Sequence, residues 1–218
     1  MKEHHISVRK TGRYFISGQI DDTKIKNVWI VCHGYGQLAK YFLRNFEVLN
    51  NGENLLIAPE GLHRFYLKGY TDRVGASWMT KEDRLNDIKD YTNFLDDLYT
   101  EILGSFKGRE VKINVLGFSQ GAATVCRWLV NKKSKANNLI LWAGVFPEDL
   151  QFEVEKSLFD SMNIFMVIGN KDEFISSEQI KLHESKLTQK GIKFEIIKFE
   201  GKHEINSMVL LELQEKLK

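Results

Sequence analysis

Short apolar runs alternate along this chain with longer segments in which apolar residues recur every three or four positions. A strand with one solvent-exposed face needs a polar residue at every second position, so runs that are apolar throughout predict a parallel sheet covered on both faces. The alternation of strands and helices predicts an α/β fold, mostly parallel, with helices on both faces. The predicted strands span residues 27–32, 54–59, 111–118, 138–145, 163–169 and 193–199.

The clearest helix is predicted over residues 84–104. Ile88, Tyr91 and Leu95 recur there at helical spacing, and Gly104 ends the pattern. Further helices are expected over residues 38–50, directly after Ser119, and over 176–190 and 204–218.

Two segments stand outside this alternation. HHISVRK and RYFISGQ flank Thr11 and Gly12, which predicts an antiparallel hairpin at one edge of the sheet. Residues 60–84 form a connection that is long for a compact domain, and such connections are usually functional or mobile. The chain shows no internal repeat or linker, so we expect a single domain over residues 1–218.

Composition and charge narrow the class of protein. The 31 basic and 29 acidic residues nearly cancel and form no basic stripe, so no nucleic-acid partner is expected. The first ten residues resemble no signal peptide, and no apolar run is long enough to span a membrane. Cys32 and Cys126 lie in apolar runs, typical of buried reduced thiols, and no Cys/His spacing suggests zinc. We expect a soluble cytoplasmic protein without stable membrane association, either a monomer or a homodimer.

The stretch GFSQG places Ser119 between two glycines, after a predicted strand and before a predicted helix. A serine in such a sharp turn is strained and crowded, and flanking glycines relieve the clash. Its hydroxyl then stands at the positive end of the helix, where the backbone N–H of Gln120 can meet a developing negative charge. Ser119 is therefore the predicted nucleophile; the alternative is a serine that only caps the helix.

A serine nucleophile needs a histidine base and a carboxylate, which follow it in this architecture in the order acid, then histidine. His203 follows both Ser119 and the last predicted strand, which makes it the predicted base. Asp172 follows the preceding strand and is the predicted acid, with Glu173 and Asp149 as alternatives.

The second oxyanion donor is expected in a loop after an early strand. VWIVCHGYG fits, because its glycines let the backbone approach the serine turn. We expect the N–H of Tyr35 to be the donor, with Gly36 as the alternative, and His33 to brace the loop rather than titrate in catalysis. A purely structural glycine turn is the remaining interpretation.

The segments HGYG, GFSQG, GNKDEFI and GKHEI, in this order, resemble the carboxylesterase, lysophospholipase and acyl-protein thioesterase family of serine hydrolases. The resemblance spans roughly residues 27 to 217. It implies an α/β-hydrolase fold and hydrolysis of carboxylic esters or thioesters without metal or cofactor. Two positions depart from the family pattern: Gln37 stands where Asp is common, and Lys202 separates Gly201 from the histidine.

The substrate is less constrained by the sequence. Phe65, Trp78 and Met79 in the long connection either line an apolar slot or pack it against the core. Little chain is left over for a large lid, so short to medium, uncharged acyl esters are expected. A peptidase or acyltransferase with the same triad, and a non-catalytic ligand-binding module, are the alternatives.

Overall fold

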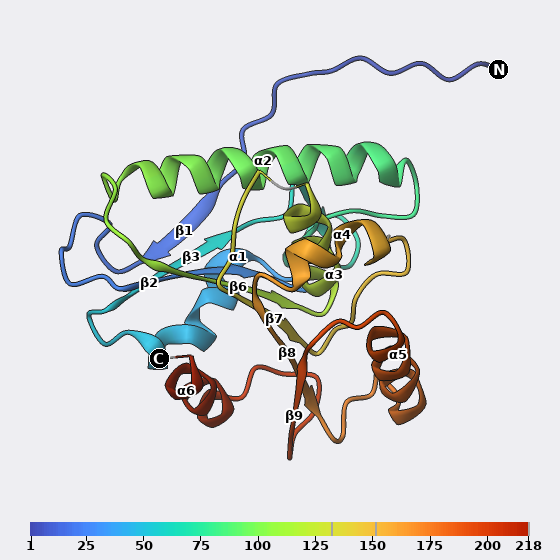
Figure 1. Cartoon of the computed structure of the whole chain (residues 1–218). Helices are drawn as coiled ribbons and strands as arrows, with labels where there is room; N and C mark the ends of the chain where they lie inside the picture. Colours follow the sequence, from blue (N-terminus) through green and yellow to red (C-terminus); the bar gives the residue numbers. More distant parts are fainter. Residues whose placement is uncertain (132, 151, 218) are drawn as a thin grey trace.

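A seven-stranded sheet runs through the computed structural model, which describes residues 1–131, 133–150 and 152–217 (Figure 1). The strand order is β1-β3-β2-β6-β7-β8-β9, and every neighbouring pair is parallel except β1 with β3. The predicted α/β class with a mostly parallel sheet is confirmed. The strands are β1 (Tyr14–Ser17), β2 (Asn27–Cys32), β3 (Asn54–Pro59), β6 (Lys112–Phe118), β7 (Asn138–Trp142), β8 (Asn163–Gly169) and β9 (Glu195–Phe199).

Two apolar layers, one on each face of the sheet, explain why the strands are apolar throughout. In β2, Val28 and Ile30 enter one buried cluster, while Trp29 and Val31 enter the other. Both sets are removed from water, which is the main stabilising term in folding. The first cluster is covered by α2 (Arg84–Gly104), α3 (Gln120–Val130), α4 (Phe152–Phe159) and α5 (Ser177–Gln189); the second is covered by α1 (Ala39–Phe42), the 3₁₀ helix η1 (Leu43–Leu49) and α6 (Ser207–Lys216).

The N-terminal edge matches the prediction in part. An N-terminal strand, β1, does pair antiparallel at one edge of the sheet, but its partner is β3 and not the segment HHISVRK, which forms no strand. Ile6 and Val8 in that segment are exposed. An isolated two-stranded hairpin is marginal in water, whereas the edge of β3 offers both backbone partners and a buried face.

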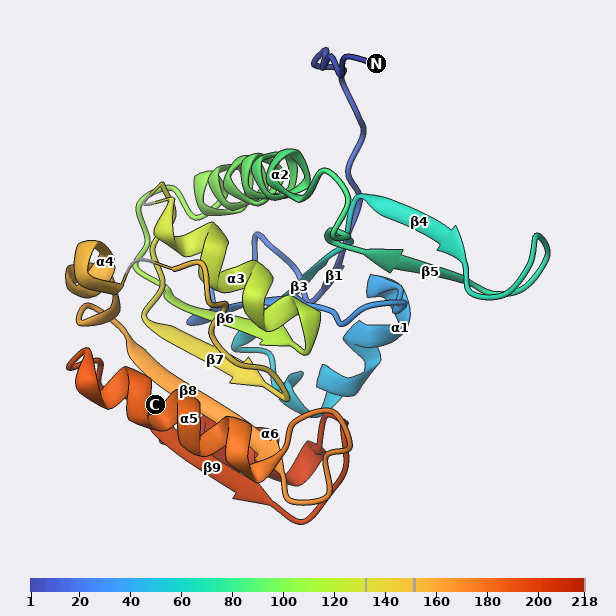
Figure 2. The ribbon, with the colours of Figure 1, turned by 90° about the vertical axis from the view of Figure 1, so that its right-hand side faces the viewer.

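The long connection over residues 60–84 contains an antiparallel hairpin that the sequence analysis did not predict. Strands β4 (His63–Tyr66) and β5 (Val74–Ser77) form it, and Figure 2 shows it projecting from the body of the molecule. The predicted helix over 38–50 is divided into α1 and η1, and α4 was not predicted. Among the described helices, none combines the length and the apolar character that crossing a bilayer requires.

Candidate active site

The carboxyl ends of five adjacent strands meet at one edge of the sheet and carry the predicted site. His33 follows β2, Ser119 follows β6, Asp172 follows β8 and His203 follows β9, while the loop after β7 begins at Ala143. Open α/β sheets bind ligands at this edge. The topology thus brings together residues that are far apart in the sequence.

Ser119 occupies a strained turn between β6 and α3. Its backbone angles are φ 53° and ψ −116°, a region that non-glycine residues rarely adopt. A Cβ at Gly117 would lie 2.2 Å from the carbonyl oxygen of Gly121, and one at Gly121 would lie 2.2 Å from the carbonyl oxygen of Cys32. Both glycines are required by close backbone approach, as the sequence pattern indicated. Gln120 begins α3, so its N–H has no acceptor within the helix.

Asp172 and His203 form a hydrogen-bonded pair. Nδ1 of His203 lies 2.8 Å from Oδ2 of Asp172, whose side chain has no exposed surface. The other carboxylate oxygen, Oδ1, accepts hydrogen bonds from the backbone N–H groups of Phe174 (2.8 Å) and Ile175 (3.2 Å). The carboxylate is therefore held by its own loop and can orient the imidazole.

Aromatic rings fix the position of His203. The ring centroids of Phe118 and Phe174 lie 4.9 Å and 4.7 Å from that of the imidazole, which keeps 18% of its side chain exposed. The backbone N–H of Lys171 donates to the carbonyl of Gly201 at 2.9 Å and so joins the loops of the acid and the base. The extra residue before His203 therefore leaves its contact with Asp172 intact. No pattern in the sequence indicated that Phe174 would contact the imidazole of His203.

The two alternative acids lie elsewhere. Glu173 is exposed and lies 4.0 Å from Lys202. Asp149 accepts hydrogen bonds from Arg127 (2.9 Å) and Arg84 (2.8 Å). Burial opposes ionisation of Asp149, but the bonds from the two guanidinium groups outweigh it, so its pKa lies below the usual value.

The loop after β2 is bridged to the hairpin strand β5. The N–H of Gly36 donates to the carbonyl of Ala76 at 2.8 Å, and the N–H of Ala76 donates to the carbonyl of Gln37 at 3.2 Å. Within the loop, Oε1 of Gln37 accepts from the N–H of Gly34 at 2.8 Å. Gln37 thus supplies a side-chain acceptor at the position where the family pattern has Asp. Tyr35 is 60% exposed at the tip of the loop.

His33 is a buried brace beneath this loop. Its Nε2 accepts from the backbone N–H of Gly61 at 2.9 Å, which leaves Nδ1–H to donate to the carbonyl of Gly34 at 2.7 Å. Burial lowers the pKa of His33 to about 4, so the ring is neutral at pH 7. Both contacts agree with the bracing role expected from the sequence.

The aromatic residues of the long connection have different environments. Trp78 is fully buried and its indole N–H donates to the carbonyl of His33 at 2.9 Å, which favours core packing, one of the two roles left open. Phe65 is half-buried, with its ring 5.2 Å from that of Tyr35. Met79 is half-buried, and its carbonyl accepts from the side-chain amide of Gln120 at 2.8 Å. The Gln120 side chain therefore ties the serine turn to this segment, a role that the sequence did not indicate.

A cavity of about 790 Å³ opens beside Ser119 and His203. Its walls come from α3, α5, the first residue of α2 and the loops after β7, β8 and β9, and Phe65, Trp78 and Met79 are not among the lining residues. No sequence pattern singled out this surface, since its residues are scattered among three helices and the loops after several strands. The residues that line it, besides the two named, are Arg84, Ala123, Arg127, Ala143, Gly144, Val145, Phe146, Pro147, Glu148, Asp149, Phe174, Ile175, Gln179 and His183.

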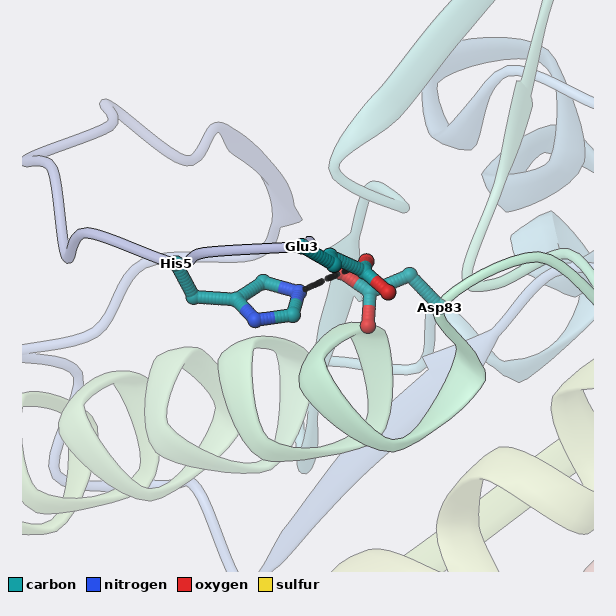
Figure 3. Close-up of side chains that lie close together, drawn as sticks. All are labelled: Glu3, His5 and Asp83. Carbon is teal, nitrogen blue, oxygen red and sulfur yellow. Dashed lines mark hydrogen bonds and ion pairs between the residues drawn. The ribbon is translucent and has the colours of Figure 1, made fainter. Parts of the chain in front are cut away.

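Apart from this site, one exposed cluster combines a histidine with two carboxylates. Nε2 of His5 lies 3.3 Å from Glu3 and 3.2 Å from Asp83 (Figure 3). These are ordinary ion-pair distances and explain the geometry without a metal. The cluster connects the N-terminal segment to the start of α2.

Comparison with known proteins identifies the family and the fold of the chain. The sequence profile of the Phospholipase/Carboxylesterase family matches residues 19–218. The fold is similar to that of Zea mays acyl-protein thioesterase 2 (TM-score 0.73, 14% identity, 95% of this chain and 98% of that one). It is also similar to the Bacillus cereus carboxylesterase (0.68, 15%, 94% and 92%) and to a phospholipase/carboxylesterase from Dyadobacter fermentans (0.64, 17%, 97% and 99%). No curated protein sequence matches significantly. On the extent of the profile match, the chain belongs to the Phospholipase/Carboxylesterase family of α/β-hydrolases.

Proposed function

We propose that this protein is a serine hydrolase of carboxylic esters or thioesters, with Ser119 as nucleophile, His203 as base and Asp172 as acid. The observation that carries the proposal is the strained, glycine-flanked Ser119, which lines one cavity with a histidine bonded to a buried carboxylate. Strain of this kind persists where it serves a function. A serine that only capped α3 would need neither the strain nor the pair beside it.

The proposed reaction has two halves. Nε2 of His203 takes the proton from Ser119 as the hydroxyl oxygen attacks the acyl carbonyl, and the imidazolium then returns that proton to the leaving alcohol or thiol. Water attacks the resulting acyl-enzyme by the same route and frees the acid. Asp172 holds the tautomer with Nδ1–H and stabilises the imidazolium. Apart from the water that hydrolyses the acyl-enzyme, the proposed catalytic groups are all groups of the protein.

The oxyanion is held by backbone N–H groups of Gln120 and Tyr35. Gln120 contributes the unpaired N–H of the first residue of α3. The N–H of Gly36 is already bonded to Ala76, which favours Tyr35 over Gly36 as the second donor. One such donor is typically worth about 2.7–4 kcal/mol in the transition state.

The proposal also covers the length of the acyl chain, the domain organisation and the cellular compartment. A cavity of about 790 Å³ suits a short to medium acyl chain, and each buried methylene adds at most about 0.8 kcal/mol until the cavity ends. Residues 1–218 act as one catalytic domain. Buried thiols at Cys32 and Cys126 suit a reducing, cytoplasmic setting.

The test compares wild type with Ser119→Ala on p-nitrophenyl butyrate, a butyryl thioester and a butyryl anilide. Wild type should cleave the ester or thioester, and Ser119→Ala should lose at least about 10³-fold in kcat while keeping its melting temperature. Ser105→Ala, at an exposed serine after α2, is the matched control and should behave as wild type. Preferential anilide cleavage would indicate a peptidase, and transfer to added alcohols an acyltransferase. No turnover with any of these would favour a ligand-binding module.

A further inference from the structure

The wall of the cavity along α3 has a regular spacing, and the inference drawn from it rests on the proposed function. Ala123 and Arg127 lie four residues apart on one face of α3, Ser119 stands in the turn directly before the helix, and all three line the cavity. Eight residues at about 1.5 Å each give roughly 12 Å along the axis. Helical side chains lean toward the N-terminus, so the guanidinium lies closer to Ser119 than this.

The far end of that wall carries two cations and one anion. Arg127 contacts Asp149 through Nε and Nη2, at 3.1 Å and 2.9 Å, and Arg84 contacts it through Nη2 at 2.8 Å. One carboxylate thus serves two guanidinium groups and leaves one positive charge uncompensated. Arg127 has a further nitrogen, Nη1, that faces the thioether of Met79 at 3.6 Å, and sulfur is a weak acceptor.

The other titratable groups at this end do not cancel the excess. Glu148 is exposed and lies 3.9 Å from Lys186, so these two charges oppose each other. Burial lowers the pKa of His183, with a further contribution from Lys186, which disfavours the charged form of this ring. Glu148 and Lys186 are both exposed and their charges are screened by water, so the excess of positive charge is that of two guanidinium groups on the single carboxylate of Asp149.

The residues that line the cavity also include the apolar Ala123, Val145 and Phe146. We propose that the substrate is an ester or thioester whose acyl chain ends in a carboxylate, with that carboxylate bound by Arg84 and Arg127. An extended chain advances about 3.3–3.6 Å per three bonds, so a span of up to about 12 Å corresponds to roughly ten bonds. This proposal departs from the expectation from sequence, which was an uncharged acyl group.

The experiment compares pairs of p-nitrophenyl esters of linear dicarboxylic acids with six to twelve carbons. In each pair the far carboxyl is either free or capped as a methyl ester. At the best length, wild type should show a kcat/KM about tenfold higher for the free carboxylate, as expected for a hydrogen bond to a charged group. The preference should shrink in 1 M NaCl because salt screens the charges.

Variants distinguish binding of the substrate carboxylate by Arg84 and Arg127 from a purely structural ion pair of these arginines with Asp149. Arg84→Gln should lower kcat/KM for the free carboxylate about tenfold and leave the capped ester within about twofold. Asp149→Asn removes the competing anion and should raise the ratio of free to capped ester. Lys186→Gln removes one positive charge on α5 beside the exposed Glu148, and should change that ratio by less than twofold. Melting temperatures identify any variant that fails to fold.

Three outcomes overturn the inference: equal or better turnover of the capped esters by wild type, the same loss on both esters in Arg84→Gln, or an equal effect of Lys186→Gln. If neither ester of any pair is cleaved, the proposed function itself fails. The two failures are therefore distinguishable in one set of measurements.

Discussion

At the scale of single residues, the site depends on a few side chains with unusual environments. Ser119 has a backbone conformation that its neighbours must enforce, Asp172 is a carboxylate without exposed surface, and His33 is a buried neutral imidazole. Without compensating contacts, the strained backbone of Ser119, the buried carboxylate of Asp172 and the buried imidazole of His33 would each destabilise the folded protein. Each is stabilised by backbone groups of the loops that end the parallel strands.

Asp172→Asn should lower kcat for ester hydrolysis by on the order of 10⁴, because an amide holds His203 in the wrong tautomer. The matched control is Glu173→Gln, at the adjacent exposed carboxylate, which should retain activity within about twofold. Steady-state kinetics on the two purified variants compares their kcat values for the same ester. The opposite order would assign the acid to Glu173.

The buried His33 should make stability fall with acid. Its pKa is about 4 in the folded protein and about 6.5 when unfolded, so the unfolded state binds the proton first as the pH drops. The folded state should lose on the order of 3 kcal/mol between about pH 6.5 and pH 4 through this group. Urea unfolding at several pH values should show a shallower loss for His33→Gln. Equal slopes for the two proteins would mean that His33 is not a buried neutral brace.

At the scale of elements, the loop after β2 and the hairpin β4–β5 act as a unit. The loop is bridged to β5, and the Gln120 side chain joins the serine turn to the segment that follows β5. Gln37 closes the loop by accepting from the N–H of Gly34. The hairpin thus contributes to the position of the loop after β2, which carries the proposed second oxyanion donor.

Gln37→Ala should therefore reduce kcat about tenfold with a smaller change in KM, since the oxyanion donor is loosened but still present. Gln37→Asn keeps an amide oxygen in the side chain and should recover part of the loss. Kinetics on a neutral ester measure both variants. A change confined to KM would place Gln37 in substrate binding rather than in loop positioning.

Trp78→Ala should act on stability more than on specificity. The indole is fully buried and hydrogen-bonded to the backbone carbonyl of His33, so its removal should lower the free energy of unfolding by about 3–5 kcal/mol. The dependence of kcat/KM on acyl length should keep its shape. Denaturant unfolding measures the loss of stability, and kcat/KM for esters with acyl chains of two to sixteen carbons measures the specificity. A shift in the preferred acyl length would indicate that Trp78 lines the acyl pocket.

At the scale of the whole molecule, the sequence predicted the sheet well and its periphery poorly. Residues 27–32 and 163–169 were located to the residue because strands buried on both faces leave a continuous apolar run. The edge strand β1 and the hairpin β4–β5 lack that signal, since their pairing depends on distant segments. The cavity walls were missed for the same reason, whereas the strained turn at Ser119 was predicted because such a turn requires glycines at fixed positions.

The most direct test of the proposed hydrolase is active-site labelling. Purified protein is treated with a fluorophosphonate, and peptide mass spectrometry locates the adduct. The account predicts one rapid adduct on Ser119, none on that peptide in Ser119→Ala, and a slowed reaction in His203→Ala because the hydroxyl has lost its base. A folded wild-type protein that stays unlabelled at Ser119, or reacts at the same rate without His203, would contradict it.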